Sequence, residues 1–416
     1  MKHALLAVVL ALGLSSPGGA QPASQILTLA TALAEANAHN PDVLAARSSV
    51  QAAQAGLEQA VPQPLQIEVS QGVTRDVPQG LGTLQTFTAG VSQQLSPALG
   101  AQRRAAASGV AVAQAQYAVA ERGVDQRVIA SYYALASAQA AVAAARLSVD
   151  NAQELERSAG TRARVGDVGR FEVLRAQVET RRAQTDLLRA QAGEAVARIA
   201  LNVLLGRAAD APATVQLSAP PASLSDVQGL YAEAAQLDPL LAQYRAAIDQ
   251  ASAQARAAQL RRLPAIGLQG GYLFQRAPGA AGATSVGPLV GVTLTLPLID
   301  YGAVRGAIRE ARAGEKLARA LYVGRDGQLR GELSEASAQI GSAQARLEFS
   351  DVSLKQAREG LRLAQFGYER GALGVLDVLS ARNELASAQS EVTQATADLA
   401  AAVASLRLMI GVPVTP

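Results

Sequence analysis

The chain carries one long pattern twice, and this duplication restricts its fold more than any other feature. Positions of about 26–206 align in order with positions of about 230–411, and the offset between matching residues drifts only from 198 to 205. A period near 200 residues is far longer than the roughly 20–50 residues of solenoid repeats. The sequence therefore predicts a duplicated unit with internal pseudo-symmetry. Matching pairs include Asn40 with Asp238, Gly166 with Gly371, and Gly206 with Gly411.

Long heptad patterns fill the second part of each repeat. No proline occurs in 98–206 or 298–411, and large apolar residues recur every seven positions with Ala or Ser three positions later. Strict heptads predict left-handed coiled coils, and the small partners allow close helix packing. The large residues are Val128, Leu135, Val142 and Val149 in the first repeat, and Leu333, Ile340, Leu347, Leu354 and Leu361 in the second.

Glycine-containing breaks divide each heptad stretch in two. They fall at 165–169 and 371–374, where glycines suit a tight turn between helices. We therefore expect one helical hairpin over 98–206 and another over 298–411. The first arm alone would be ~100 Å long at ~1.5 Å per residue.

Alternating segments precede each hairpin, over about 65–95 and 265–296. Apolar residues occupy every second position, which predicts strands with one apolar face and one polar or small face. We expect glycine-rich loops over 74–83 and 275–286. The predicted apolar face collects Ile67, Val69, Val73, Phe87, Val91, Leu95, Ile266, Leu268, Tyr272, Phe274, Val290, Val292, Leu294 and Leu296.

These strands fit either a soluble sheet packed on a helix or a membrane sheet. Their lengths match the ~9–11 residues that membrane strands need. Four strands cannot close a lipid-facing barrel, because the smallest barrels have ~8. A membrane sheet would therefore require several protomers to share one barrel, since lipid does not tolerate open sheet edges.

The first residues predict export. Lys2 and His3 precede an apolar run over 4–14 and small residues up to Ala20, which is typical of a signal peptide over 1–20. The run is shorter than the ~20 residues of a membrane-spanning helix, and we expect no later stretch to be apolar enough for one. The predicted organisation continues with a first repeat over 21–206, a proline-containing linker over 207–228, a second repeat over 229–411 and a tail over 412–416.

Composition argues against catalytic and nucleic-acid functions. The chain has no Cys and two His, which excludes cysteine-ligated metals, disulfides and Cys nucleophiles. A formal charge of +3 is too small for a nucleic-acid surface. His39 lies beside Asn40 and Pro41 at an expected helix start. We therefore predict no enzyme, cofactor or metal site, and no nucleic-acid partner.

The break in the second repeat has the most distinctive residues. Positions 366–382 are FGYERGALGVLDVLSAR, and positions 161–177, TRARVGDVGRFEVLRAQ, echo them. Together with the duplication and the strand pairs, this segment resembles the TolC-type outer-membrane efflux channels over essentially the whole mature chain. A periplasmic adaptor protein is the alternative, although an adaptor would carry one coiled-coil hairpin in place of two.

The resemblance implies a mainly α fold with a small β part. Three copies would pool four strands each into a twelve-stranded outer-membrane barrel, and their helices would form a periplasmic tunnel. Such a channel passively conducts substrates of an efflux or type I secretion system from an inner-membrane pump and a periplasmic adaptor. The hairpin tips would dock the adaptor: Val165, Gly166, Asp167, Val168, Gly169, Gly371, Ala372, Leu373 and Gly374.

The resemblance also implies a constriction near the tips. A ring of three Asp377 carboxylates would favour cations there, whereas Ser380 stands where some members have a second carboxylate. Tyr368 would bond Glu172 between hairpins, and Leu373 departs from a basic latch of some members. Two structural alternatives stay open, in which Asp377 stabilises a helix N-terminus and Tyr368 only packs in the seam.

Overall fold

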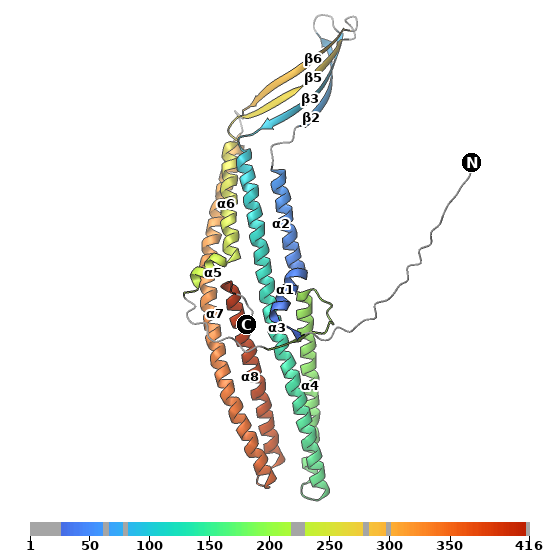
Figure 1. The fold of residues 1–416 in the computed structure, drawn as a ribbon, viewed down its shortest axis with the longest axis vertical. Helices are drawn as coiled ribbons and strands as arrows, with labels where there is room; N and C mark the ends of the chain where they lie inside the picture. Colours follow the sequence, from blue (N-terminus) through green and yellow to red (C-terminus); the bar gives the residue numbers. More distant parts are fainter. Residues whose placement is uncertain are drawn as a thin grey trace, which may run out of the picture.

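The computed structural model describes residues 26–60, 66–77, 82–217, 229–277, 283–296 and 301–412. Two short helices, two strands and two long helices follow one another in each repeat (Figure 1). The first repeat comprises α1 (Leu29–His39), α2 (Pro41–Gln59), β2 (Gln66–Val77), β3 (Gly82–Leu95), α3 (Leu99–Arg164) and α4 (Arg170–Leu205). The second comprises α5 (Tyr231–Leu237), α6 (Pro239–Leu260), β5 (Ala265–Ala277), β6 (Ala283–Thr295), α7 (Ala303–Glu369) and α8 (Val375–Met409).

The elements form three layers along the long axis of the molecule (Figure 1). The sheet has the strand order β2-β3-β5-β6 and lies at one end. Beneath it, α3 packs against α2 and α6, and α6 packs against α7. In the far half, α3 packs against α4 and α8, and α8 packs against α7. In each layer the elements therefore form a row, and each of the two outermost elements packs against a neighbour on only one of its sides.

The heptad residues pack as the sequence predicts. Val128 and Leu135 of α3 are fully buried in a cluster with residues of α1, α4 and α8. Leu333 and Ile340 of α7 are buried in a second cluster with residues of α8. The alanine positions are buried too, as Ala176 and Ala343 illustrate. Because the small residues lie between helices, the backbones approach closely along both hairpins. This confirms the predicted coiled-coil hairpins.

One 18-residue window within α3 is apolar enough, by length and composition, to cross a membrane, with a mean hydropathy of 1.4. The expectation that no later stretch would be so apolar was therefore wrong. The cause is the alanine content of α3, because alanine raises hydropathy while serving as the small residue of a packed seam. Only 39% of the window is buried within one protomer.

The sheet places the predicted apolar residues on one face. Antiparallel pairing joins Ile67 to Val91, Leu95 to Ile266 and Phe274 to Val286, so these side chains point to the same side. Glu68, Ser92 and Gln269 belong to the alternate positions and point to the other side. The sheet thus has an apolar face, largely exposed in one protomer, and a polar face.

The strands run further than the alternation indicated. The loops expected over 74–83 and 275–286 are shorter, because β2 continues to Val77 and β6 already begins at Ala283. Backbone pairing extends beyond the apolar band, as in the pairing of Thr74 with Leu84, and this pairing requires no side-chain alternation. Residues 78–81 and 278–282 lie outside the described part of the chain.

A small parallel sheet near the middle of the molecule was not predicted from the sequence. It pairs β1 (Ile26–Leu27) with β4 (Thr214–Val215), and β4 lies within the segment expected to be a linker. The Tyr132 hydroxyl lies 3.0 Å from the Leu27 carbonyl and 3.1 Å from the Gln216 carbonyl. These contacts fasten both short strands to α3.

Helix α3 also makes polar contacts with the short helices of both repeats near the middle of the molecule. Arg122 donates a 3.0 Å hydrogen bond to the carbonyl of Leu237, while Asp125 accepts a 2.9 Å hydrogen bond from the Asn37 amide. Burial, with a smaller contribution from Glu121, raises the pKa of Asp125 to about 6 against the lowering effects of Asn37 and Arg122. The first repeat thus holds a half-buried carboxylate whose pKa lies well above its ordinary value.

We predict that Asp125→Asn stabilises the protein at neutral pH. The folded-state pKa of about 6 exceeds the unfolded value of ~3.9. The folded state therefore binds more protons between these values, and the stability contribution of Asp125 falls as the pH rises from ~4 to 6. In thermal unfolding, the stability of Asp125→Asn relative to the wild type should therefore increase as the pH rises across this range. Asp150→Asn, on the exposed surface of α3, is the control, and a stability difference between Asp125→Asn and the wild type that stays constant with pH would contradict the assignment.

Candidate pore constriction and docking tips

The two hairpin turns have the same local structure. Gly166 and Gly371 adopt left-handed backbone conformations, with φ of 78° and 74°. The amides of Asp167 and Ala372 then bond the carbonyls of Arg162 and Gly367 five residues earlier, which is the Schellman pattern that ends helices. Only glycine adopts this conformation without steric cost, so the sequence places both turns where the glycines are.

Both turns lie together at the end of the molecule furthest from the sheet (Figure 1). Eight of the nine residues predicted as docking tips are exposed and the ninth is half-buried. The exposed ones are Val165, Gly166, Asp167, Gly169, Gly371, Ala372, Leu373 and Gly374, and the half-buried one is Val168.

Asp377 lies in the first turn of α8, three residues after the helix N-cap Gly374. Its Oδ2 accepts a 2.8 Å hydrogen bond from the Gly374 amide, which is the carboxylate half of a capping box. The predicted structural role at the helix N-terminus is therefore present. The side chain is also exposed, and Ser380 is exposed one turn later. Capping leaves the negative charge available to solvent on that face.

Tyr368 of α7 contacts α3 of the other hairpin through apolar packing and through a cation–π contact of its ring. It contacts the cluster of Leu155, Val375 and Leu379, and the Arg162 guanidinium lies 4.6 Å from the ring centroid. The buried Tyr368 hydroxyl and Glu172 Oε2 have no hydrogen-bond partner among the described residues. The expected bond between Tyr368 and Glu172 is thus not formed within one protomer.

Arg162 is the residue that sequence reasoning missed at this place. Its Nε lies 2.5 Å from Asp167 Oδ2 in the same turn, and this hydrogen bond raises the pKa of Arg162. The ion pair holds the guanidinium against Tyr368, where cation–π attraction is favourable. No periodic pattern singles out Arg162, because it belongs to the last turn of α3 and is one of several arginines there.

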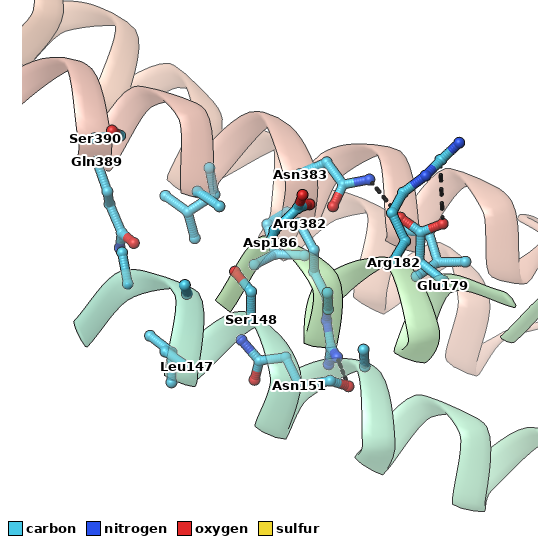
Figure 2. A pocket seen from close by; sticks show the side chains of 18 of the residues that line it. Leu147, Ser148, Asn151, Glu179, Arg182, Asp186, Arg382, Asn383, Gln389 and Ser390 are labelled. Atoms are coloured by element: carbon cyan, nitrogen blue, oxygen red, sulfur yellow. Dashed lines mark hydrogen bonds and ion pairs between the residues drawn. The ribbon is translucent and has the colours of Figure 1, made fainter. Parts of the chain in front are cut away.

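A groove of about 500 Å³ separates the hairpins above the tips, between α3, α4 and α8 (Figure 2). Arg382 of α8 donates a 2.7 Å hydrogen bond to the carbonyl of Asn151 in α3. Asn383 donates one of 3.1 Å to Glu179 of α4, and Glu179 also pairs with Arg182 at 3.5 Å. Figure 2 shows the contacts of Arg382 and Asn383 crossing the groove, while the Glu179–Arg182 pair lies within α4. Neighbouring residues of α8 therefore hold both arms of the first hairpin.

Within the described residues, no group of three or more His, Asp or Glu side chains is placed to hold a metal ion. The charged side chains near the tips instead form pairs within a helix or across the groove. Glu359 and Arg362, one turn apart on α7, illustrate the first kind with a 2.6 Å contact.

Comparison with known proteins gives a family and a fold. The family described as outer membrane efflux protein matches residues 32–207 and 230–412. The cobalt-zinc-cadmium resistance protein CzcC of Cupriavidus metallidurans is 26% identical over 368 residues, which cover 86% of this chain and 84% of that protein.

Solved structures repeat the fold at low sequence identity. The outer membrane protein VceC from Vibrio cholerae is 20% identical, with a TM-score of 0.76 over 93% of this chain and 97% of VceC. The outer-membrane channel OprN is 19% identical, with a TM-score of 0.77 over 93% of this chain and 91% of OprN. CusC is 20% identical, with a TM-score of 0.76 over 92% of both chains.

Proposed function

The protein belongs to the outer membrane efflux protein family, and on that premise we propose that three copies form the channel of a tripartite efflux or type I secretion assembly. The channel lies in the outer membrane, extends into the periplasm and does no chemistry. The observation that carries this proposal is a four-stranded sheet with an apolar face, a polar face and two open edges, β2 and β6.

The open edges support a shared barrel. Unpaired backbone groups are too costly in lipid, and four strands are fewer than the ~8 that close the smallest membrane barrel. Joining β6 of one protomer to β2 of the next satisfies both edges. Three protomers then give twelve strands, with the apolar face toward lipid and the polar face lining an aqueous passage.

The outer helices of the far layer support the same closure. Helix α4 carries an exposed apolar stripe at heptad spacing on the side away from α3, and α7 carries another on the side away from α8. Joining two different surfaces repeatedly closes a ring when the rotation fits. The α4 stripe includes Phe171, Leu174, Val178, Leu188, Val196, Ile199 and Val203, and the α7 stripe includes Phe349, Val352, Leu363 and Phe366.

The remaining parts follow from this arrangement. The tips around Gly166 and Gly371 face the inner membrane, where the periplasmic adaptor docks and the pump supplies energy. Opening rotates one hairpin against the other, and the contacts of Tyr368, Arg382 and Asn383 hold the closed state. Residues 1–20, which lie outside the described residues, direct export and are removed. The mature chain then consists of a first repeat over 21–206, a linker over 207–228, a second repeat over 229–411 and a tail over 412–416.

The adaptor alternative is less well supported. An adaptor would carry one hairpin, whereas this chain has two, α3–α4 and α7–α8, each preceded by a strand pair. The family match also covers both repeats.

Asp377→Asn tests the constriction. Three Asp377 side chains near the tips would form an anionic ring, which attracts cations. Asparagine keeps a side-chain oxygen for the Gly374 amide and removes only the charge. We expect planar-bilayer recordings of Asp377→Asn to show reduced cation selectivity and weaker block by multivalent cations. Ser380→Ala is the control, and unchanged selectivity and block in Asp377→Asn would remove this residue from the pore.

A deletion strain tests the transport function. We expect the strain to become sensitive to at least one compound in a panel of drugs, solvents and metal salts, and the wild-type gene to restore resistance. Co²⁺, Zn²⁺ and Cd²⁺ belong in the panel because CzcC is a cobalt-zinc-cadmium resistance protein. Co-purification of an adaptor and a pump should accompany this phenotype. A strain with unchanged export and resistance throughout would count against the proposal.

A further inference from the structure

A concentration of positive charge surrounds the junction between the sheet and the helices. The segments next to the sheet, 50–65, 96–107, 253–264 and 297–319, carry ten Arg or Lys and four Asp or Glu. This excess is larger than the +3 of the whole chain. We name these cations the basic belt: Arg103, Arg104, Arg256, Arg261, Arg262, Arg305, Arg309, Arg312, Lys316 and Arg319.

The basic belt is exposed and largely unpaired. All ten side chains are exposed. Within the described part of the chain, Arg319 alone among them forms an ion pair, at 2.6 Å to Glu315. Elsewhere ten of the 24 described arginines form ion pairs, as Arg325 does with Asp238 and Glu332. Nine of the ten cations thus have no ion pair within the described residues and are available to anions from outside the chain.

The apolar face of the sheet locates this level relative to the membrane. The apolar positions continue to the helix-proximal ends of the strands, at Leu95, Ile266 and Leu296. Arg262 precedes Ile266 by four residues, and Arg103 and Arg305 follow Leu95 and Leu296 by eight and nine. Arg103, Arg261, Arg262 and Arg305 thus lie near the helix-proximal end of the apolar band, and the cations of α7 continue from there for ~21 Å, at ~1.5 Å per residue, as far as Arg319.

The cations of the basic belt on α7 face outward from the proposed tunnel. At ~100° per residue, these five cations lie within an arc of ~80°. Viewed down the helix axis, the centre of this arc lies ~100° to one side of the buried face formed by Ile308 and Ala318. It lies ~140° to the other side of the exposed apolar face formed by Leu317 and Leu321. If these two faces contact the neighbouring helices, those neighbours are only ~120° apart on the side opposite the cations. The neighbours of a helix in a ring lie less than 180° apart on the lumen side, so these cations point away from the lumen.

We propose that the basic belt binds the anionic headgroups of phospholipids in the periplasmic leaflet of the outer membrane. This proposal rests on the proposed function, because it requires the apolar face of the sheet to lie in that membrane. Exposed guanidinium groups bind phosphate in a bidentate manner, and basic residues beside an anionic membrane surface attract it within a Debye length of ~8 Å. The belt thereby fixes the height of the channel in the membrane.

The test compares two variants that lose equal charge. The belt variant is Arg305→Gln, Arg309→Gln and Arg312→Gln. The control variant is Arg146→Gln, Lys355→Gln and Arg358→Gln, which removes three exposed cations from the tip half of the molecule. Each mature protein is reconstituted in nanodiscs of phosphatidylcholine alone or mixed with phosphatidylglycerol, and its Tm and retained phosphatidylglycerol are measured.

We expect phosphatidylglycerol to raise the Tm of the wild type and the control variant. The belt variant should lose more than half of this shift and bind phosphatidylglycerol about tenfold more weakly. Equal shifts in all three proteins would overturn the proposal, as would an equal shift produced by soluble glycerol phosphate in phosphatidylcholine nanodiscs. Arg261→Gln with Arg262→Gln replaces the belt variant if that variant fails to fold. Single-channel conductance of the same preparations tests the proposed function separately.

Discussion

Placing carboxylates in the exposed apolar stripe of α4 is expected to abolish trimer formation. Leu188 and Val196 are 66% and 68% exposed in one protomer and point away from α3, so Leu188→Glu with Val196→Glu leaves the hairpin contacts intact. In the trimer both positions would be buried against α7 of the neighbouring protomer. An uncompensated buried charge costs ~3–5 kcal/mol, and the three interfaces would contain six of them.

The measurement is the mass of the detergent-solubilised protein together with its circular dichroism. We expect the double variant to be monomeric with a helix content like that of the wild type. Gln184→Glu with Gln191→Glu adds the same charge to a different face of α4 and should stay trimeric. A trimeric Leu188→Glu, Val196→Glu protein would show that this stripe does not form the interface.

A single methyl group at Gly271 is expected to disrupt the sheet. Gly271 of β5 pairs with Gly90 of β3. A Cβ atom at Gly271 would lie 2.4 Å from the Ala89 carbonyl oxygen and 2.5 Å from the Gly90 Cα. Both contacts involve backbone, which cannot move without breaking the pairing of the two repeats. Overpacking of this kind typically costs ~1–3 kcal/mol or more, and the shared barrel would contain it three times.

Gly270→Ala is the matched control, because nothing lies within 4 Å of a Cβ at that neighbouring position. We expect Gly271→Ala to reduce the amount of folded trimer in outer-membrane fractions about tenfold, and Gly270→Ala to leave it near the wild-type level. Equal amounts of the two variants would contradict the close approach of β3 and β5.

Periodic residues made most of the fold predictable from the sequence. Heptads of Leu, Val and Ala specify the helical hairpins, because only a constant helical face produces that spacing, and Gly166 and Gly371 specify the turns. Alternation over about 65–95 and 265–296 specifies which face of the sheet is apolar. In each case many residues repeat one physical requirement.

Contacts made by single residues could not be predicted in this way. Arg382 and Asn383 reach across the groove to Asn151 and Glu179, which are more than 200 residues away in the chain. The pairing of β1 with β4 involves two residues on each side, too few for any alternation to be visible. Tyr368 was singled out, but its partner Arg162 depends on a side-chain direction that the ion pair with Asp167 determines.

The exposed stripes and open edges of one protomer have a common explanation. In every layer one outer element, β2, α2 or α4, lies on one side, and β6 or α7 lies on the other. In the proposed trimer, a single rotation that joins these sides would complete the barrel and the tunnel together. The Leu188→Glu, Val196→Glu variant tests this closure directly, whereas Gly271→Ala tests the β3–β5 pairing that joins the two strand pairs within each chain.

The most direct test is the native mass of the purified mature protein, combined with bilayer recordings of the same sample. We predict a detergent-requiring particle of three chains that inserts into planar bilayers and conducts ions. A monomer that stays in solution without detergent and carries no current would contradict the shared barrel and the export function built on it.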